Sequence, residues 1–216
     1  MSGLFRKLEM LYSLKDGVMF VGEAIMDQYK NFSAIILSGG KSSRMGTDKC
    51  DLIYEGDTLL NFQVNKMMEL GIDDIIAAGY RGSNCKCKVI KDDISKGPVS
   101  GILVGLKKIK YDRAVVLSVD VPLIRKETIQ KIMIQSVDKD LDIVIARHSG
   151  KREPLVGIYK KNIIEKIEKV LNEDDFSAMK LFDMCDSGMV DVDDDDKYFI
   201  NVNYREDYNI LLHSSV

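Results

Sequence analysis

The segment LSGGKSSRMGTDK (37–49) brings a glycine pair close to three cations, two of which are Arg44 and Lys49. Glycines that follow an apolar run let the chain turn with positive φ, so that backbone N–H groups can approach phosphate oxygens. A Walker A loop would need a further glycine five residues before Gly40, but Ile35 stands there. The segment therefore predicts an anion-binding loop that is not a P-loop. An ordinary glycine turn with solvated cations is the simpler alternative.

Asp120 is the second residue whose position suggests chemistry. It follows AVVLSV (114–119), a nearly continuous apolar run. Ligands of open α/β sheets collect at the carboxyl ends of such strands. A carboxylate beside a phosphate-binding loop would suit Mg²⁺, which takes oxygen ligands and shares the phosphates of a substrate. Capping a turn before Pro122 is the alternative role.

Taken as a whole, the loop resembles the signature of nucleotidyltransferases built on a Rossmann-like sheet, and its Gly-Gly pair makes it most similar to molybdenum cofactor guanylyltransferases. The shared pattern is Leu, a small residue, Gly-Gly, then Ser-x-Arg-Met-Gly and a lysine three residues later. In that family the loop holds the triphosphate, and the arginine and lysine neutralise it. The resemblance implies catalytic roles for Arg44, Lys49 and Asp120, with Asp120 as the metal ligand. It also implies nucleotide contacts from Leu37, Ser38, Gly39, Gly40, Lys49 and Asp120.

A third motif, KDDISKGPVSGI, matches the family's aspartate followed by Gly-Pro-x-x-Gly. Gly97 and Pro98 open an expected helix, whose N-terminal end carries unpaired N–H groups and a positive dipole. Proline is also common in the first turn of helices in general, so the motif alone does not indicate a ligand. Nucleotide binding by Asp92, Gly97 and Pro98 is what the resemblance implies. Ala78 is a departure, because the family often has an asparagine there that touches the nucleotide.

Two further segments could hold a second substrate. RHSGKREP gathers cations from Arg147 onward around one turn and ends at Pro154, which suits a phosphate, although a solvated basic hairpin has the same composition. In FINVN, Asn201 and Asn203 would point the same way from an extended segment. One of them could instead cap the following helix. The resemblance implies that these four residues bind the pterin acceptor.

Short apolar runs alternate with amphipathic stretches from Ser33 onward, and these elements must position the residues above. Continuous apolar strands that alternate with helices predict a mainly parallel sheet covered on both faces. The expected fold class is therefore α/β, and the resemblance implies a Rossmann-like sheet of the nucleotide-diphospho-sugar transferase type. Expected strands lie at 33–38, 73–79, 87–90, 113–122, 142–147, 154–159 and 199–203, and expected helices at 58–71, 97–110, 126–136, 162–171, 177–185 and 205–212.

Residues 32–216 show no linker rich in Pro, Gly or Ser and no internal repeat, so they predict a single nucleotidyltransferase domain. Residues 1–31 stand apart as an N-terminal extension. Leu4, Leu8 and Leu11 have near-helical spacing. We therefore expect the extension to be helical and to pack on the domain or in an oligomer contact.

The composition limits the classes of function. A net charge of −3 over 216 residues, with both signs in balance, argues against a nucleic-acid or membrane-surface binder. No uncharged apolar run reaches the ~18 residues of a membrane span. Four irregularly spaced cysteines, among them Cys85 and Cys87, favour reduced thiols in a cytoplasmic protein over a zinc site.

The reaction that the resemblance implies is transfer of GMP from GTP to Mo-molybdopterin, which yields molybdopterin guanine dinucleotide and pyrophosphate and requires Mg²⁺. Molybdoenzymes or their chaperones are the expected recipients of the product. A related nucleotidylyltransferase that uses CTP, or a sugar or cobinamide phosphate acceptor, is one alternative. A non-catalytic guanine-nucleotide-binding partner of molybdoenzymes is the other. Arg44, Lys49 and Asp120 together favour an enzyme, because a binder need not keep both metal and leaving-group contacts.

Overall fold

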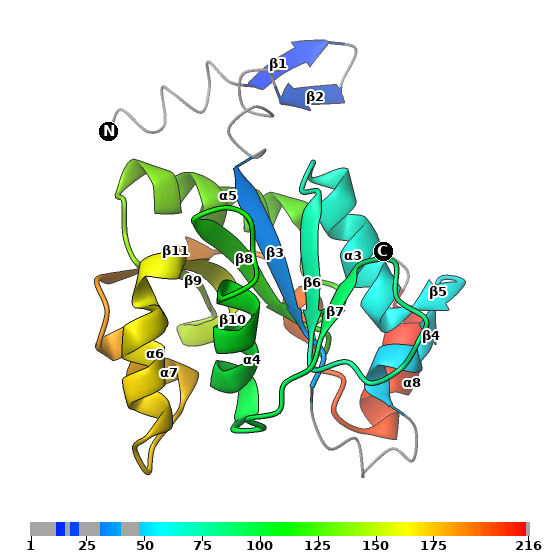
Figure 1. Ribbon diagram of the computed structural model, residues 1–216. Coiled ribbons are helices and arrows are strands. Elements are labelled where there is room, and N and C mark those ends of the chain that lie inside the picture. The colour runs from blue at the N-terminus through cyan, green and yellow to red at the C-terminus, as the bar shows by residue number, and fades with distance from the viewer. Residues whose placement is uncertain (1–11, 16–17, 22–30, 40–47, 215–216) are drawn as a thin grey trace.

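A seven-stranded sheet forms the centre of the protein in the computed structural model, which describes residues 12–15, 18–21, 31–39 and 48–214 (Figure 1). Its strands are β3 (Phe32–Leu37), β6 (Asp74–Ala78), β7 (Lys88–Ile90), β8 (Arg113–Ser118), β9 (Ile143–His148), β10 (Lys151–Lys160) and β11 (Ser187–Val192). Their order in space is β11-β9-β10-β8-β3-β6-β7. Strand β10 runs antiparallel to β8 and β9, and the other neighbours are parallel. The predicted α/β class with a mostly parallel sheet is confirmed.

The three central strands end side by side, and this alignment positions the site. Strand β3 lies between β8 and β6, with Leu37 opposite Ser118 on one side and Ala78 on the other. All the residues of β3 are buried, because both faces of the sheet are covered, and this explains the continuous apolar run. The loops that follow Leu37, Ala78 and Ser118 therefore meet at one edge of the sheet, called here the carboxyl edge.

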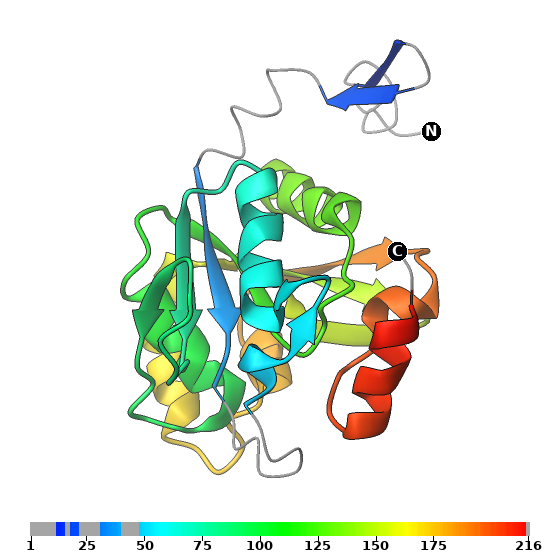
Figure 2. The same cartoon turned by 90° about the vertical axis from the view of Figure 1, so that its right-hand side faces the viewer.

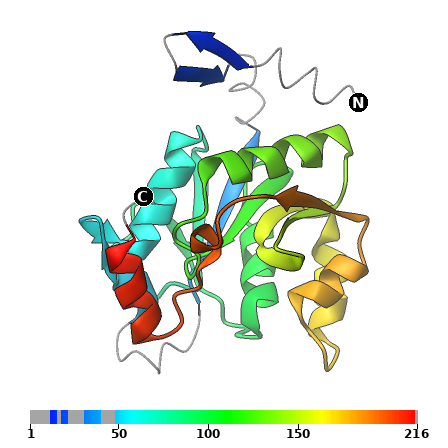
Figure 3. The same ribbon diagram turned by 180° about the vertical axis from the view of Figure 1, so that it is seen from behind.

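Helices cover the two faces of the sheet. Helices α4, α6 and α7 lie on the face seen in Figure 1, and α3 and α5 on the face seen from behind in Figure 3. Each layer has its own hydrophobic cluster: Leu60 and Ile132 belong to one, Ile102 and Ile167 to the other. The helices are α3 (Leu59–Glu69), α4 (Gly97–Leu106), α5 (Lys126–Asp138), α6 (Ile164–Leu171), α7 (Ala178–Asp183) and α8 (Arg205–His213). The short elements are η1 (Lys49–Asp51), β4 (Ile53–Tyr54), β5 (Asp57–Thr58), η2 (Lys161–Ile163) and η3 (Asp196–Phe199).

The last helix folds back onto the segment that precedes α3. Helix α8 lies beside the small ribbon of β4 and β5 (Figure 2). The Tyr208 hydroxyl donates to the carbonyl of Ile53 at 2.6 Å, and the Tyr54 hydroxyl donates to the carbonyl of Ser214 at 3.1 Å. These contacts bring the chain just before α8 close to η1, which follows the glycine loop.

The N-terminal extension is not helical where the structure describes it. β1 (Tyr12–Lys15) and β2 (Val18–Val21) pair as antiparallel strands. The sequence signal is an Asp-Gly dipeptide between two short runs with alternating or β-branched residues, which favours a two-residue hairpin connection. Leu4, Leu8 and Leu11, on which the helical expectation rested, lie outside the residues that the structure describes.

The C-terminal part of the sheet also differs from the prediction. Residues 187–192 form the edge strand β11, whose side chains are mostly half-buried, so SGMVDV lacks the continuous apolar character of the other strands. FINVN, in contrast, is not a strand. Phe199 closes the 3₁₀ turn η3, and residues 200–203 have no regular secondary structure. An irregular segment can nevertheless present side chains to a site.

The expectations drawn from composition can be compared with the structure in two respects. All four cysteines are free thiols. Cys50 is buried, and burial raises the pKa of its thiol. Among the helices of the described residues, none is long and apolar enough to cross a membrane.

Candidate active site

A cavity of about 460 Å³ opens at the carboxyl edge. A volume of this size suits a small-molecule site. Six of the residues expected to bind the nucleotide lie in its wall, namely Leu37, Gly39, Asp92, Gly97, Pro98 and Asp120. The other lining residues are Ala78, Gly79, Arg81, Ser95, Gly101, Ser118 and Leu155. The hydroxyl of Ser38 does not line the cavity and donates instead to the carbonyl of Ala78 at 3.0 Å, which ties the end of β3 to β6.

Glycines allow backbone segments to approach one another around this cavity. Gly79 has a φ of +91°, and a Cβ at this position would stand 2.7 Å from the Cα of Gly39. At Gly101 of α4, a Cβ would stand 2.9 Å from Cδ2 of Leu37. A side chain at Gly79 would therefore displace the start of the glycine loop, and one at Gly101 would push α4 away from β3.

The start of α4 closes one side of the cavity. Asp92 shapes this side, because its Oδ1 accepts from the backbone N–H groups of Ile94 and Ser95, both at 3.1 Å, and its Oδ2 accepts from the Ser100 hydroxyl at 2.6 Å. Gly97 has a φ of +68°, which favours glycine. Within the described part of the chain, no side chain makes a capping hydrogen bond at the start of α4, so its first N–H groups can serve an anion or a nucleotide edge.

Asp120 sits in a tight turn after β8 that several elements hold. The N–H of Val119 donates to the carbonyl of Leu37 at 3.0 Å, and the N–H of Val121 donates to the carbonyl of Ser118 at 3.3 Å. The carbonyl of Asp120 accepts from the N–H of Val202 at 2.8 Å. The turn is thus fixed both by β3 and by the irregular segment that precedes α8.

Three segments far apart in the sequence meet at the side chain of Asp120. Nζ of Lys49 lies 3.3 Å from Oδ1 of Asp120 and donates to Oδ1 of Asn203 at 2.8 Å. Lys49 comes from η1, Asp120 from the turn after β8, and Asn203 from the segment before α8. Lys49 was expected to bind the nucleotide and Asn203 the acceptor. In the structure these two side chains are in direct contact.

The environment of the Asp120 carboxylate suits a cation. Burial raises its pKa above the ordinary value, and the ammonium of Lys49 opposes that shift. Its side chain is still 29% exposed, so it can reach a ligand in the cavity. Among the described residues, no group of three or more His, Cys, Asp or Glu side chains is placed to hold a metal ion. A single carboxylate, completed by substrate phosphates and water, is a common way for proteins to bind Mg²⁺.

None of the four residues expected to bind the acceptor is among the residues that line the cavity. Arg147 makes a bidentate ion pair with Asp191 across β9 and β11, with Nε–Oδ1 and Nη2–Oδ2 distances of 2.5 and 2.6 Å. The carbonyl of Pro154 accepts from the Tyr159 hydroxyl at 2.6 Å. Asn201 Nδ2 donates to the carbonyl of Phe199 at 3.4 Å. Of the four, Asn203 is the one that contacts Lys49, which in turn pairs with Asp120.

Sequence reasoning overlooked several residues of the cavity wall. Gly79 directly follows β6, and Arg81 comes two residues later, so a glycine and a cation after a buried strand were the available signal. Ala78, where the family often has an asparagine, is 1% exposed and lies in the wall. Gly40 and Arg44 lie outside the residues that the structure describes.

A Rossmann-like sheet with a cavity at its carboxyl edge, beside a glycine that follows the first central strand, is the arrangement of nucleotide-binding α/β proteins. Comparison with known proteins narrows the class. Residues 34–187 match the model of the MobA-like NTP transferase domain. Because this match extends over more than half of the chain, the protein belongs to the MobA-like nucleotidyltransferase family.

Individual relatives agree with this assignment. The chain is 30% identical over 197 residues to the probable molybdenum cofactor guanylyltransferase of Bacillus cytotoxicus, a match that covers 85% of this chain and 97% of the relative. The crystal structure of molybdopterin-guanine dinucleotide biosynthesis protein A from Archaeoglobus fulgidus has a TM-score of 0.70 and 17% identity, and the match covers 84% of this chain and 97% of that one. A Mycobacterium tuberculosis H37Rv protein solved in complex with manganese has a TM-score of 0.63 and 16% identity, over 86% and 100% of the chains. The two solved structures support the fold.

Proposed function

We propose that the protein transfers GMP from GTP to the terminal phosphate of Mo-molybdopterin, releasing pyrophosphate. The observation that carries this proposal is the contact of Lys49 with both Asp120 and Asn203. It joins the end of the glycine loop, a carboxylate at the cavity and the segment expected to hold the acceptor. The relative named as a molybdenum cofactor guanylyltransferase matches over 85% of this chain, which supports the same reaction.

No covalent intermediate with the protein is needed. An oxygen of the molybdopterin phosphate attacks the α-phosphorus of GTP, the bond from the α-phosphorus to the bridging oxygen breaks, and pyrophosphate leaves. The ammonium of Lys49 and the N–H groups at the start of α4 offset the negative charge of the phosphates, and Arg44 is expected to do so from the loop. The contribution of the protein is then positioning and electrostatic stabilisation.

Asp120 would hold the Mg²⁺ ion. A divalent cation supplies charge neutralisation between the phosphate oxygens when it is bound there. Backbone hydrogen bonds from Val202 to Asp120 and from Val119 to Leu37 fix the main chain of the turn, and Lys49 contacts the carboxylate itself. The manganese complex of a structural neighbour is consistent with a divalent metal at this fold.

Asn203 links the two substrates. Its Oδ1 accepts from Lys49, so its Nδ2 remains on the far side of the amide for the acceptor. We therefore expect Asn203→Ala to impair use of both substrates, whereas Asn201→Ala should affect the acceptor alone. This differs from the simple division of sites that the sequence suggested.

The choice of base depends on the polar groups of the cavity wall. A site that pairs with one base edge rejects the other strongly, because its buried polar groups would be left unpaired. Ala78 is almost fully buried against α4, and unlike an asparagine it has no side-chain amide. Guanine would then be recognised by backbone groups and by Asp92, Ser95 or Arg81, which line the same cavity.

Pyrophosphate release from GTP and CTP, with purified Mo-molybdopterin as the acceptor, tests the proposal. We expect a higher kcat/KM for GTP and the dinucleotide product in the mixture. A preference for CTP would move the protein to the cytidylyltransferase branch. Binding of GTP without pyrophosphate release would favour a non-catalytic nucleotide-binding protein. Pyrophosphate release with a sugar phosphate but not with molybdopterin would show that the acceptor is a sugar phosphate. We expect the reaction to take place in the cytoplasm, with the product passed to molybdoenzymes or their chaperones.

A further inference from the structure

Two side chains of α3 reach across to the turn that carries Asp120. Nε2 of Gln63 donates to the carbonyl of Val121 at 2.8 Å and to that of Ser118 at 3.3 Å. Nζ of Lys66 donates to the carbonyl of Pro122 at 2.6 Å. Three carbonyls on both sides of Asp120 are therefore held from one helix.

The two side chains also hold each other. Nζ of Lys66 donates to Oε1 of Gln63 at 3.2 Å. Gln63 is fully buried, and its amide uses both donor hydrogens and its acceptor within this network. The arrangement leaves Gln63 one orientation, because turning the amide over would set its oxygen against two carbonyls.

The ammonium of Lys66 is half-buried and therefore partly desolvated, which is unfavourable for a charged group. Burial lowers the pKa of its ammonium to about 7, and the positive charge of Lys126 adds to this effect, while Glu69 opposes it. Its direct oxygen partners are a backbone carbonyl and an amide, and Phe62 lies beneath it with Nζ 5.2 Å from the ring centroid. A methionine would fill a similar volume without the cost of desolvating a charge.

We propose that Gln63 and Lys66 are positioning residues for Asp120. They fix the turn from Ser118 to Pro122 so that the carboxylate stands in the geometry needed to hold the metal against the nucleotide. This inference rests on the proposed role of Asp120 as the metal ligand. Partners that orient a metal ligand typically contribute about 10-fold to 100-fold in metal affinity or activity.

The test uses the full chain with Lys66→Met and Gln63→Met, and with Asn65→Ala as the matched control. Asn65 lies on the same helix and hydrogen-bonds to Asp57 at 3.3 Å instead of to the turn. The measurements are Mn²⁺ affinity in the presence of GTP by electron paramagnetic resonance, the Tm at pH 7, and kcat and KM for transfer. Mn²⁺ serves as a visible substitute for Mg²⁺.

For Lys66→Met we expect Mn²⁺ affinity and kcat each about 10-fold lower and the KM for GTP little changed. Its Tm should change little, because removal of a partly desolvated charge offsets the loss of the donor to Pro122 and Gln63. Gln63→Met should weaken Mn²⁺ binding in the same direction, with a lower Tm because it leaves buried carbonyls without donors. Asn65→Ala should change neither Mn²⁺ affinity nor kcat. A stable Lys66 variant with weakened metal binding is the result that a purely structural role would not give.

Unchanged Mn²⁺ affinity and kcat in Lys66→Met would overturn the proposal, as would a loss of activity that merely follows a loss of Tm. Asp120→Asn separates this outcome from a failure of the proposed function. If Asp120→Asn leaves Mn²⁺ binding intact, the metal assignment is wrong and the positioning role is overturned with it. If the unaltered protein binds Mn²⁺ and GTP but transfers nothing to molybdopterin, the acceptor is wrong, and the Mn²⁺ affinities of the variants still decide the positioning role.

Discussion

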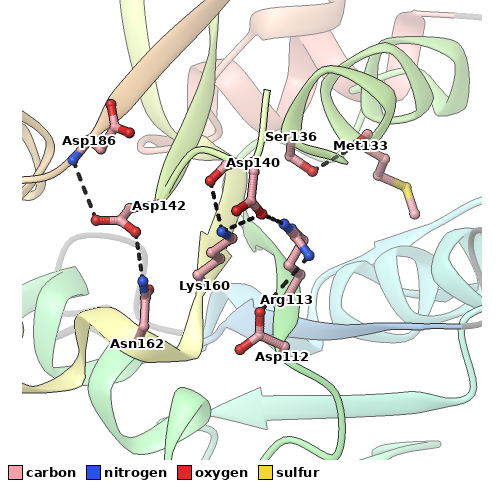
Figure 4. A network of polar contacts seen from close by, with 9 residues as sticks. All are labelled: Asp112, Arg113, Met133, Ser136, Asp140, Asp142, Lys160, Asn162 and Asp186. Atoms are coloured by element: carbon pink, nitrogen blue, oxygen red, sulfur yellow. Dashed lines mark hydrogen bonds and ion pairs between the residues drawn. The ribbon is translucent and has the colours of Figure 1, made fainter. Parts of the chain in front are cut away.

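The two ends of the central sheet use the same kinds of residue in opposite ways. At the carboxyl edge, Asp120 stands beside Lys49 and Asn203 and lines the cavity. At the other end, where β8 and β9 begin and β10 finishes, Asp140 and Asp142 are surrounded by donors (Figure 4). The pKa of Asp120 is raised, whereas the pKa values of Asp140 and Asp142 are lowered.

The donors explain the difference. Lys160, which is 7% exposed, donates to the carbonyl and to Oδ1 of Asp140 at 2.7 and 2.6 Å, and Arg113 donates to the same carboxylate at 2.5 Å. Burial alone would raise the pKa of Asp142, but Lys166 and Asn162 donate to it and reverse the shift. This end of the sheet holds its carboxylates by saturating them with hydrogen bonds.

A binding site and a structural network of similar composition differ in how stable the charged form of the carboxylate is. A carboxylate that is more stable charged in the folded protein contributes to folding. One that is less stable charged, as at Asp120, costs stability and keeps its capacity to bind a cation. The direction of the pKa shift therefore distinguishes the two ends better than the number of charges does.

The largest effect is expected from removing the negative charge of Asp120. Asp120→Asn should lower transfer by ~10²–10³-fold, because one electrostatic contact to the reacting phosphates is lost. Its Tm should not fall, because a carboxylate with an unfavourable environment has been removed. Pyrophosphate release and thermal unfolding measure the two effects.

Asp142→Asn is the matched change at the other end. It should keep kcat within about twofold, while the loss of its charged hydrogen bonds should cost about 1–3 kcal/mol of unfolding free energy. In a chain of this size that corresponds to a Tm lower by roughly 3–10 °C. A lower Tm in Asp120→Asn together with a lower kcat in Asp142→Asn would contradict the assignment of a binding role to one end and a structural role to the other.

Gly79→Ala tests how strongly the carboxyl edge depends on backbone contact. The positive φ of Gly79 and the 2.7 Å approach to Gly39 predict a shifted glycine loop and a KM for GTP raised about 10-fold. Gly56→Ala is the control, because Gly56 has a φ of +83° but nothing within 4 Å of an added Cβ. It should show the backbone strain, about 1–2 kcal/mol, without the change in KM. Equal KM values in the two variants would argue against the contact.

The pH dependence of stability should have opposite signs at the two ends. With a raised folded pKa, Asp120 makes the protein lose stability as pH rises from its ordinary value of 3.8 through that raised pKa. With a lowered pKa, Asp142 contributes stability that is present above 3.8 and is lost as pH falls through its folded pKa. Denaturant unfolding from pH 3 to 8, in the presence of a chelator, measures the unfolding free energy of the unaltered protein, of Asp120→Asn and of Asp142→Asn. The difference between each variant and the unaltered protein gives the pH dependence that each carboxylate contributes. Parallel slopes would show that the ends are electrostatically alike.

The smallest effect is expected from removing the N-terminal extension. Deletion up to Tyr29 should leave kcat and Tm nearly unchanged, because β3 begins at Phe32, at the end of the sheet far from Asp120. There Ser33 already donates to Asp74 at 2.5 Å and accepts from the N–H of Tyr111 at 3.2 Å. Activity and thermal unfolding of the truncated chain measure this, and insoluble or inactive protein would show that the extension belongs to the domain.

The sequence predicted the central strands well, because strands buried on both faces must be apolar throughout. It failed at β11, whose side chains are mostly half-buried, and at the hairpin of β1 and β2. In the site, Asp120, Asp92 and Gly97 were predicted from motifs and line one cavity. Contacts between distant segments, such as Gly39 with Gly79 or Gln63 with Val121, leave no local pattern in one sequence.

The hydrogen bond from Val202 to Asp120 and the contact of Asn203 with Lys49 have a consequence for the order in which the protein becomes competent during synthesis. The ribosome delivers the glycine loop first, the turn of Asp120 about seventy residues later and Asn203 after the last strand of the sheet. A nascent chain that has formed β3, β6 and β8 therefore still lacks the hydrogen bond from Val202 to the Asp120 turn and the contact of Asn203 with Lys49. A chain that ends before Val202 would contain all the strands of the sheet but neither of these contacts.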